Sequence, residues 1–383
     1  MNDQYATRKR NLEAVWNALI HQGRATRQSL ADETKLSLMT ISSLVALLNE
    51  RGALTQLTPQ NVGIRRSLGR RVQTIEARRD RCGWIAVNLT SLSFTAKRLT
   101  MSGEQFLPDC RYEYNAASSY KHNLRDFLER VRDLEGAADA LGVAVIAPGP
   151  YDVATDTVRN VRIPDLNSVR VKETLREILH CRSVFVEEDV KLSIRAFMPR
   201  QDLRRGDTLV YIYLGEGVGG AVAYQGEVLR GQNAVTGDFG QTIGSFGATF
   251  ESELSSSAFE REARISGKTE AFNSRAAILA QMIHNIMWSV DPTRIVIECQ
   301  YTADQSDSNC FAERTMSALQ DTLRAGTLRA PNILFKRTES PSLAQGVALI
   351  LSKQWIDDVV MGDRDGECAA EVNALAEGAD LYG

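Results

Sequence analysis

The 383-residue sequence has few features that would place the chain in a membrane, outside the cell or around a metal ion. Its longest apolar run, Leu141–Pro148, falls far short of the roughly 18 residues that cross a bilayer. The first ten residues are polar and lack the apolar core of a secretory signal, so we expect a cytoplasmic protein without a membrane segment. The six cysteines form no CxxC pair and no pairing with histidine, so we expect reduced thiols and no structural metal.

The composition is that of a folded protein of ordinary polarity. Apolar residues make up 43% and charged residues 24% of the chain, which excludes wholesale disorder and collagen-like sequence. A chain of this length predicts two or three domains.

Charge is distributed unevenly along the chain. The net charge is −3, but residues 1–80 carry 13 Lys and Arg against 7 Asp and Glu, which leaves +6 there and −9 in the remainder. A basic end on an acidic body is typical of a module that binds a polyanion. A solvated basic face is the alternative.

The basic segment has the pattern of three helices. Apolar residues recur at helical spacing over Leu12–Ile20. Thr26 is placed to cap a short second helix that ends near Lys35, and Ser37 is placed to cap a third helix that ends before Gly52. Two helices joined by a turn of about four residues are typical of a helix-turn-helix, whose second helix presents its N-terminal residues to base edges.

A β-hairpin wing is predicted after the third helix. Residues 53–56 and 72–76 read as strands, and the segment between them is rich in glycine and arginine. The alternative is a three-helix bundle with a solvated basic hairpin. If the segment binds double-stranded DNA, the expected contact residues are Arg27, Ser37, Met39, Thr40, Ser43, Arg65, Arg66, Arg70 and Arg71.

From Gly83 onward, strand patterns alternate with helix patterns, which predicts an α/β body. The predicted strands are Trp84–Asn88, Phe94–Thr100, Leu141–Ile146, Ser183–Glu187, Thr208–Leu214 and Gly220–Tyr224. The predicted helices are Leu124–Leu134, Val171–Leu179, Val190–Phe197, Ser274–Val290, Arg314–Leu323 and Ser342–Lys353. We expect a DNA-binding domain at 1–80, α/β lobes at 81–200 and 201–360, and an acidic, partly disordered tail at 361–383.

The order of these motifs resembles the ROK family, which contains bacterial sugar kinases and sugar-responsive repressors of xylose and N-acetylglucosamine genes. The resemblance covers about residues 9–355. Leu36–Ser42 is similar to the recognition helix of the repressors, and Gly69–Arg71 is similar to their wing. The resemblance implies a winged helix-turn-helix followed by an actin-like ATPase body, with two ribonuclease-H-like lobes and ligands in the cleft between them. It also implies a homodimer or homotetramer, and a dimer suits a palindromic operator.

The phosphate-binding motifs of the family's kinases are altered at three places. Asn88–Leu92 stands where the kinases carry Asp-x-Gly-Gly-Thr, and the Gly-Gly pair expected after Ile295–Ile297 is missing. Leu214–Gly220 keeps its glycines, which also suit a tight hairpin, but has Glu216 in place of threonine. At an effective dielectric constant of about 20, a carboxylate about 4 Å from a phosphate charge costs on the order of 4 kcal/mol. We therefore expect no kinase activity and no cofactor.

The sugar-binding motifs are altered as well. Glu187–Asp189 stands where the family has Glu-Asn-Asp, and Thr236–Gln241 resembles its Ala-Gly-Glu-Ile-Gly-His motif without the histidine. The cysteines of the family's zinc segment are also missing, so we expect no zinc. The effector contacts that the resemblance implies are Gly149, Glu188, Asp189, Asp238, Gln241 and Glu251.

Two of these carboxylates have structural alternatives, Asp189 as a helix N-cap and Glu251 as a solvent-facing residue of a first helical turn. No Lys or Arg within these motifs offsets the carboxylates, so the pocket suits a sugar or, equally, a cationic ligand. The sequence predicts a DNA-binding regulator, a repressor of carbohydrate-related genes gated by a small sugar-like ligand. The alternatives are a regulator with a vestigial pocket controlled by a partner protein, and an active ATP-dependent sugar kinase.

Overall fold

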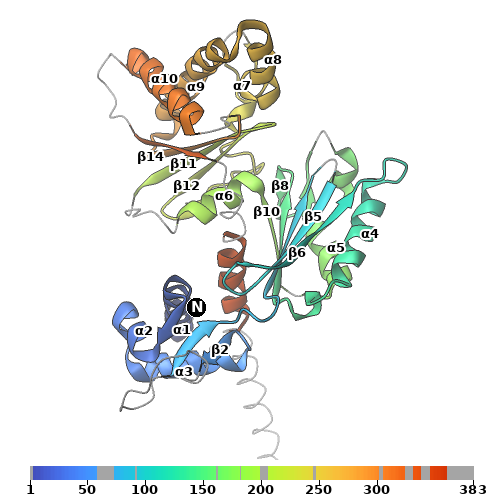
Figure 1. The fold of residues 1–383 in the computed structure, drawn as a ribbon, viewed down its shortest axis with the longest axis vertical. Coiled ribbons are helices and arrows are strands. Elements are labelled where there is room, and N and C mark those ends of the chain that lie inside the picture. The colour runs from blue at the N-terminus through green and yellow to red at the C-terminus, as the bar shows by residue number, and fades with distance from the viewer. Residues whose placement is uncertain are drawn as a thin grey trace, which may run out of the picture. The chain divides into compact units, whose positions relative to one another are not determined.

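A computed structural model describes residues 3–57, 73–90, 93–160, 163–181, 183–198, 206–244, 247–301, 305–323, 331–337 and 346–359. Two compact units are present (Figure 1). The first contains residues 1–146, 168–186 and 347–383, and the second contains residues 147–167 and 187–346. Each unit is thus built from separate stretches of chain. The four-part division expected from the sequence stays a prediction, and the acidic tail lies outside the described residues.

Three helices and a small sheet form the N-terminal part of the first unit. The helices are α1 (Asp3–Gln22), α2 (Arg27–Thr34) and α3 (Leu38–Glu50). The strands β1 (Arg24–Thr26), β2 (Leu54–Leu57) and β3 (Thr74–Ala77) pair antiparallel in the order β1-β3-β2. The apolar faces of the helices enclose a core that includes Leu12, Val15, Trp16, Leu30, Ile41 and Leu48.

Local capping sets the ends of α2 and α3, as the sequence predicts. Thr26 and Ser29 form a reciprocal capping box, in which each hydroxyl accepts the other residue's backbone N–H. Lys35 ends α2 in the left-handed conformation, with φ of 60°. Two residues later, Ser37 accepts the Thr40 backbone N–H at 3.1 Å and begins α3. The turn between the two helices is therefore only three residues long.

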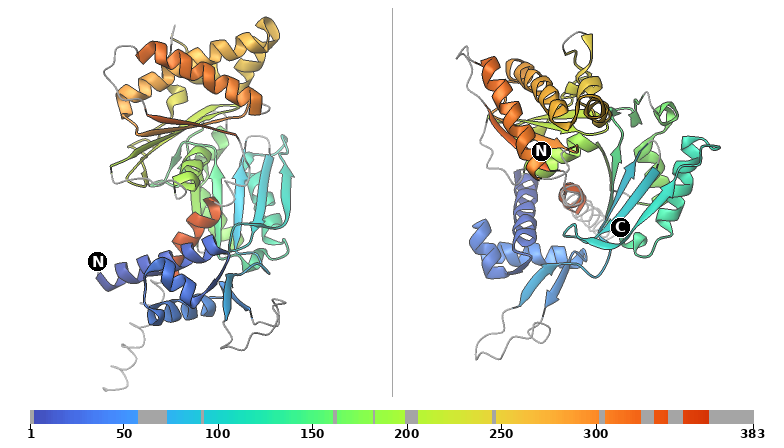
Figure 2. Two further views of the ribbon diagram at one scale, coloured as in Figure 1. Left: turned by 60° about the vertical axis from the view of Figure 1, so that its left-hand side comes forward. Right: turned by 45° about the horizontal axis from the view of Figure 1, so that its top comes forward.

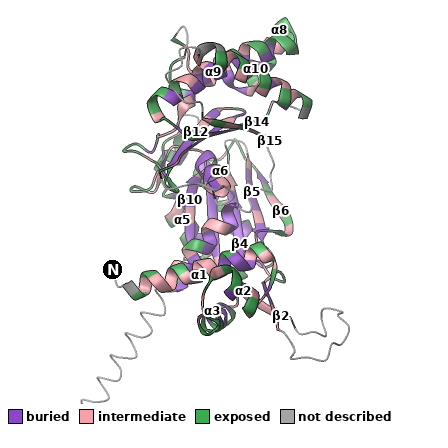
Figure 3. Ribbon diagram, turned by 90° about the vertical axis from the view of Figure 1, so that its left-hand side faces the viewer, coloured by how far each residue is buried: buried purple, intermediate pink, exposed green. Residues whose placement is uncertain are grey.

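A five-stranded sheet follows, in the order β10-β7-β4-β5-β6. Its strands are β4 (Trp84–Leu89), β5 (Ser93–Leu99), β6 (Gln105–Glu113), β7 (Gly142–Ala147) and β10 (Val184–Glu188). The pairs β4–β5 and β5–β6 are antiparallel, whereas β4 and β7 are parallel. The accompanying helices are α4 (Tyr120–Arg132), α5 (Val171–Leu179) and the short η2 (Ala137–Asp139) and η3 (Pro164–Ser168). Buried residues line the central strands, whereas exposed residues follow α2 and α3 (Figure 3).

Helical residues 346–359 return to the N-terminal helix. Trp355 lies between Trp16 of α1 and Trp84 of β4, with ring centroids 5.9 and 6.4 Å away, respectively. Lys9 of α1 forms an ion pair with Asp357 at 2.5 Å. The last described helix therefore completes the core beneath the DNA-binding candidate helices, on the side of α1 that carries Trp16.

The second unit contains a second five-stranded sheet, in the order β13-β12-β11-β14-β15. Its strands are β11 (Thr208–Leu214), β12 (Val218–Tyr224), β13 (Glu227–Val228), β14 (Arg294–Cys299) and β15 (Asn332–Arg337). The helices are α6 (Asp189–Phe197), α7 (Phe250–Leu254), α8 (Ser256–Ser266), α9 (Lys268–Val290), α10 (Gln305–Leu323) and the short η5 (Phe239–Gln241). A small hairpin pairs β8 (Tyr151–Asp152) with β9 (Thr157–Val158).

The helices of the second unit cover both faces of this sheet. Helices α9 and α10 lie side by side over one face (Figures 1 and 2), and the apolar side chains of α7, α9 and α10 form one core with β11 and β14. Val190 and Ile194 of α6 pack on the other face, against Leu209 and Tyr211. The N-terminus of α6, where the predicted effector residues begin, is thereby attached to a rigid sheet.

The two large sheets share one topology. In each sheet, three consecutive antiparallel strands are followed by two further strands on the side of the first strand. The predicted α/β class is therefore correct. Strands β6 and β15 and helices α7 and α8 were not predicted, and α9 and α10 begin earlier than the sequence suggested. No described helix is long and apolar enough to cross a membrane.

Candidate functional site

The predicted DNA contacts on α3 form an exposed surface at the start of that helix. The Met39 side chain is 84% exposed, and Ser37 and Ser43 are exposed as well. The Thr40 hydroxyl lies 2.9 Å from that of Ser37, so the cap orients it. The first turns of α3 thus present an uncharged surface of small hydroxyl side chains beside the exposed Leu38 and Met39.

Of the arginines predicted to contact DNA, only Arg27 lies among the described residues. Arg27 begins α2 and donates to the Gln73 side chain at 2.9 Å, which ties α2 to the base of the β2–β3 hairpin. Arg65, Arg66, Arg70 and Arg71 lie outside the described residues. Their role in a wing stays a prediction.

The predicted effector residues all belong to the second unit, where four carboxylates gather. Glu188 and Asp189 join β10 to α6, Asp238 precedes η5, and Glu251 lies in the first turn of α7. Loss of solvent and the negative charges of Glu251, Glu188 and Asp189 raise the pKa of Asp238 to about 6. The structure therefore brings these four predicted residues into one electrostatic cluster.

Glycines allow the loop of Asp238 to approach β12 closely. Gly237 has a φ of 91°, and a Cβ there would lie 2.7 Å from the Ala221 Cα. A Cβ on Gly240 would collide with the Val218 carbonyl oxygen. The Thr236–Gln241 motif therefore needs its two glycines, because a Cβ at either position would collide with the backbone of β12. Gln241 itself is exposed at the end of η5, and its contact with a ligand stays a prediction.

Lys191, which lies just outside the Glu187–Asp189 motif, offsets the charge of one of these carboxylates. Its side chain is only 2% exposed, and its Nζ donates to Glu188 Oε1 at 2.6 Å and to the Ala234 carbonyl at 2.5 Å. Glu188 Oε1 also accepts the Tyr151 backbone N–H at 3.0 Å. Glu188 is consequently a bound structural carboxylate at the start of α6. Sequence reasoning missed Lys191, although its i,i+3 spacing from Glu188 was a usable signal.

The predicted Gly149 is close to the same carboxylate. A Cβ at position 149 would lie 2.5 Å from Glu188 Oε2, and the Asn160 side chain donates to the Gly149 carbonyl at 3.0 Å. Beside it, the fully buried Glu187 pairs with Arg195 at 3.1 Å and with Arg230 at 2.6 Å. The absence of a side chain at Gly149 lets Glu188 approach this loop, and contact of Gly149 with a ligand stays a prediction.

The structure shows the local contacts of Asp189 and Glu251, the two carboxylates with structural alternatives. Glu188 occupies the cap position of α6, and Asp189 is the first helical residue, with its Oδ1 accepting the Val190 N–H at 2.7 Å. Loss of solvent, with a smaller contribution from the Glu188 charge, raises the pKa of Asp189. Glu251 does not simply face solvent, because it accepts the Val218 backbone N–H at 3.2 Å. Contact of either carboxylate with a ligand stays a prediction.

No metal site is evident among the described residues, since no group of three or more His, Cys, Asp and Glu side chains is arranged to hold an ion. Five cysteines are described, and all have free thiols.

The repeated strand order and the carboxylate cluster define an α/β body of the actin-like ATPase type. Residues 95–250 match the ROK family, so the chain contains a ROK family domain. The resemblance seen in the motifs is confirmed over this stretch. A crystal structure described as a ROK family transcriptional regulator, homologous to the Escherichia coli Mlc protein, superposes with a TM-score of 0.68 at 17% identity. The match covers 93% of this chain and 98% of that chain.

Sugar kinases are similar to parts of the chain. An N-acetyl-D-glucosamine kinase from Yersinia pestis is 26% identical over 117 residues, which make up 30% of this chain and 44% of the kinase. The chain therefore matches less than half of the length of this relative. A ROK family glucokinase from Streptomyces griseus, solved with glucose and AMPPNP, has a TM-score of 0.53 at 15% identity, covering 69% of this chain and 97% of that chain. The body fold is thus shared by regulators and kinases.

Proposed function

We propose that the protein is a DNA-binding transcription regulator that responds to a small sugar-like ligand and has no sugar kinase activity. The N-terminal helices act as a winged helix-turn-helix, and the proposed partner is a palindromic operator bound by a homodimer or homotetramer in the cytoplasm. The proposed role is repression of carbohydrate-related genes. The carbohydrate assignment draws on the glucokinase with bound glucose and the N-acetyl-D-glucosamine kinase to which the chain is similar.

The observation that carries this proposal is the geometry of α2 and α3. Two capped helices are joined by the three-residue turn 35–37, and the first turns of the second helix are exposed beside the β2–β3 hairpin. A recognition helix needs this arrangement, because its N-terminal residues must reach base edges in the major groove. The net charge of +6 over residues 1–80 supports a polyanionic partner.

The hairpin between β11 and β12 argues against phosphoryl transfer. A kinase of this kind needs free backbone donors here to hold nucleotide phosphates. In this chain the Val218 N–H is bonded to the Glu251 carboxylate, and the exposed Glu216 adds a second negative charge at the turn. These groups do not fit a nucleoside triphosphate, because its phosphates would meet carboxylates where they need donors.

The carboxylate cluster supports a ligand with hydroxyl groups. Lys191 satisfies Glu188, so the available acceptors are Asp189 and Asp238, which suit the O–H donors of a sugar. The offset charge weakens the case for a cationic ligand that the sequence left open.

Genomic DNA capture tests DNA binding. The purified full chain is incubated with sheared genomic DNA, and the retained fragments are sequenced. We expect a single enriched sequence motif with two-fold symmetry, and we expect Met39→Ala to change which bases are preferred. Retention without any enriched motif, unchanged by Met39→Ala, would contradict recognition by α3.

Thermal shift and turnover measurements test the ligand and the enzyme alternative. The panel contains glucose, xylose, N-acetylglucosamine, glucosamine and ATP with magnesium. A shift with one sugar that Asp189→Asn abolishes, without loss of DNA binding, supports the proposed pocket. Sugar-dependent ATP hydrolysis by the pure protein would instead establish the kinase. No shift with any compound would favour control by a partner protein.

A further inference from the structure

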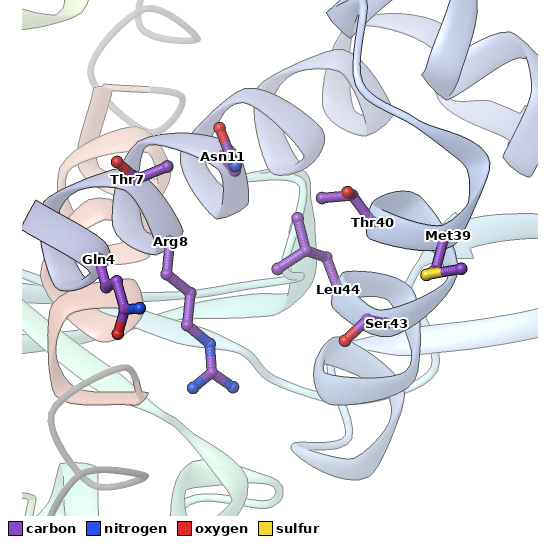
Figure 4. Close-up of a pocket in the computed structure, with 8 residues that line it drawn as sticks. All are labelled: Gln4, Thr7, Arg8, Asn11, Met39, Thr40, Ser43 and Leu44. Atoms are coloured by element: carbon purple, nitrogen blue, oxygen red, sulfur yellow. The ribbon is translucent and has the colours of Figure 1, made fainter.

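A groove lies between the N-terminal half of α1 and the start of α3 (Figure 4). Its volume is about 600 Å³. Helix α1 supplies one wall and α3 supplies the other. The lining residues are Gln4, Thr7, Arg8 and Asn11 from α1, and Met39, Thr40, Ser43 and Leu44 from α3. The predicted DNA contacts on α3 therefore face a wall that the sequence analysis did not include.

The chemistry of the walls suits a phosphodiester. The α1 wall consists of amide, hydroxyl and guanidinium groups, all of which can donate hydrogen bonds, and none of the eight lining residues carries a carboxylate. The exposed Met39 adds apolar surface beside these donors, and Leu44, which is largely buried, also lines the groove. Alternating charged phosphates and apolar sugar faces are the two features of a nucleic-acid strand that such walls match.

The two sides of α1 have different partners. At about 100° per residue, the four groove residues of α1 fall within a sector of about 100°, and Lys9, Glu13 and Trp16 lie on the opposite side of the helix. Lys9 pairs with Asp357 at 2.5 Å, and Trp16 packs against Trp355. Because the protein holds the far side, the groove side of α1 is fixed in position relative to α3.

We propose that the α1–α3 groove binds one sugar-phosphate strand of the DNA, with Arg8 contacting a phosphate and Asn11 donating to the same strand. This inference rests on the proposed DNA-binding function. Arg8 is the charged member of the lining, and Arg10, which contacts the Thr7 hydroxyl at 3.5 Å, extends the positive charge along α1. The base contacts then come from Met39 and Ser43 on the facing helix.

Salt titration of DNA binding by Arg8→Gln tests the groove. The probe is the DNA fragment captured by the wild-type chain, and affinity is measured by fluorescence anisotropy between 50 and 300 mM salt. Losing one phosphate contact should lower the slope of log K against log salt by about 0.9, which corresponds to about eightfold weaker binding at 0.1 M salt. The loss should be the same on unrelated DNA, because phosphates carry no sequence information.

Matched variants distinguish a local contact from a change in net charge. Arg264→Gln removes the same charge from an exposed position on α8, and it should leave both slope and affinity unchanged. Arg8→Lys should keep most of the slope, and Asn11→Ala should weaken binding with no change in slope. Circular dichroism and melting curves of each variant establish that the helices are intact.

Three outcomes overturn the inference in different ways. An Arg8→Gln slope equal to the wild-type slope, with base preference still changed by Met39→Ala, would leave DNA binding on α3 and remove the groove from it. Loss of a sugar-induced thermal shift in Arg8→Gln, with an unchanged salt slope, would assign the groove to a small ligand. A wild-type chain that retains no DNA would overturn the proposed function together with this inference.

Discussion

Replacing Lys191 by Met should destabilise the second unit, because the Glu188 charge would lose its buried cation. The Lys191 side chain is 2% exposed and that of Glu188 is 15% exposed, and the two are joined at 2.6 Å. Breaking a buried ion pair by removing one partner costs about 3–5 kcal/mol. Glu188 keeps the Tyr151 N–H and some solvent contact, so we expect the lower end of that range.

The double substitution makes this prediction specific. In a Lys191→Met background, Glu188→Gln removes the uncompensated charge and should recover about 2 kcal/mol. The coupling energy of the double-mutant cycle is this recovery plus the cost of Glu188→Gln alone. Glu188→Gln alone should cost less than Lys191→Met, because the amide oxygen still accepts from Tyr151. For a unit of this size, each kcal/mol of lost stability corresponds to a fall of about 2–4 °C in melting temperature.

Hydrogen exchange of α6 and thermal melting supply the measurement. Lys191→Met should melt about 6–12 °C below the wild type, and the α6 amides should exchange correspondingly faster. A shift below 2 °C, or a double variant no more stable than Lys191→Met alone, would refute the assignment of Lys191 and Glu188 as a coupled buried pair.

Three further predictions concern the core, the titration of the cluster and the cap. Trp355→Ala should cost about 3–5 kcal/mol, whereas Trp288→Ala, at a residue 58% exposed, should stay within about 0.5 kcal/mol in the same urea titration. Because the fold raises the pKa of Asp238 to about 6, the wild type loses stability as the pH rises through that value. Asp238→Asn should therefore raise the melting temperature at pH 7.5 more than at pH 4.5, and equal effects at both would contradict the raised pKa. Ser37→Ala should cost about 1 kcal/mol and weaken DNA binding, as measured by melting and by anisotropy.

Features that depend on nearby residues could be predicted from the sequence. The caps at Thr26 and Ser37 and the turn at Lys35 depend on hydrogen bonds across three or four residues, so their positions follow from residue type. The repeated α/β pattern likewise indicated the class of the body. The edge strands β6 and β15 were missed because their alternation of apolar and polar residues is weak, and β6 also contains Pro108.

The sequence predicted the carboxylates of the candidate site but not the lysine that offsets part of their charge. Motif positions located Glu188, Asp189, Asp238 and Glu251, which the structure gathers. The role of Lys191 depends on burial against Ala234, 43 residues away, and no local pattern reports that contact. The groove wall on α1 was missed for a similar reason, because only the tertiary structure places Arg8 of α1 opposite α3.

The packing of Trp355 against Trp16 also sets an order of events during synthesis of the chain. Roughly 340 residues separate the two rings, and at about 5–20 residues per second the ribosome needs about 17–70 s to make that stretch. During this time α1 lacks one of its aromatic neighbours, and the Lys9–Asp357 pair has not formed. The core beneath the proposed DNA-binding helices is therefore completed only after the body has been translated, so a chain interrupted before residue 346 carries those helices without their final support.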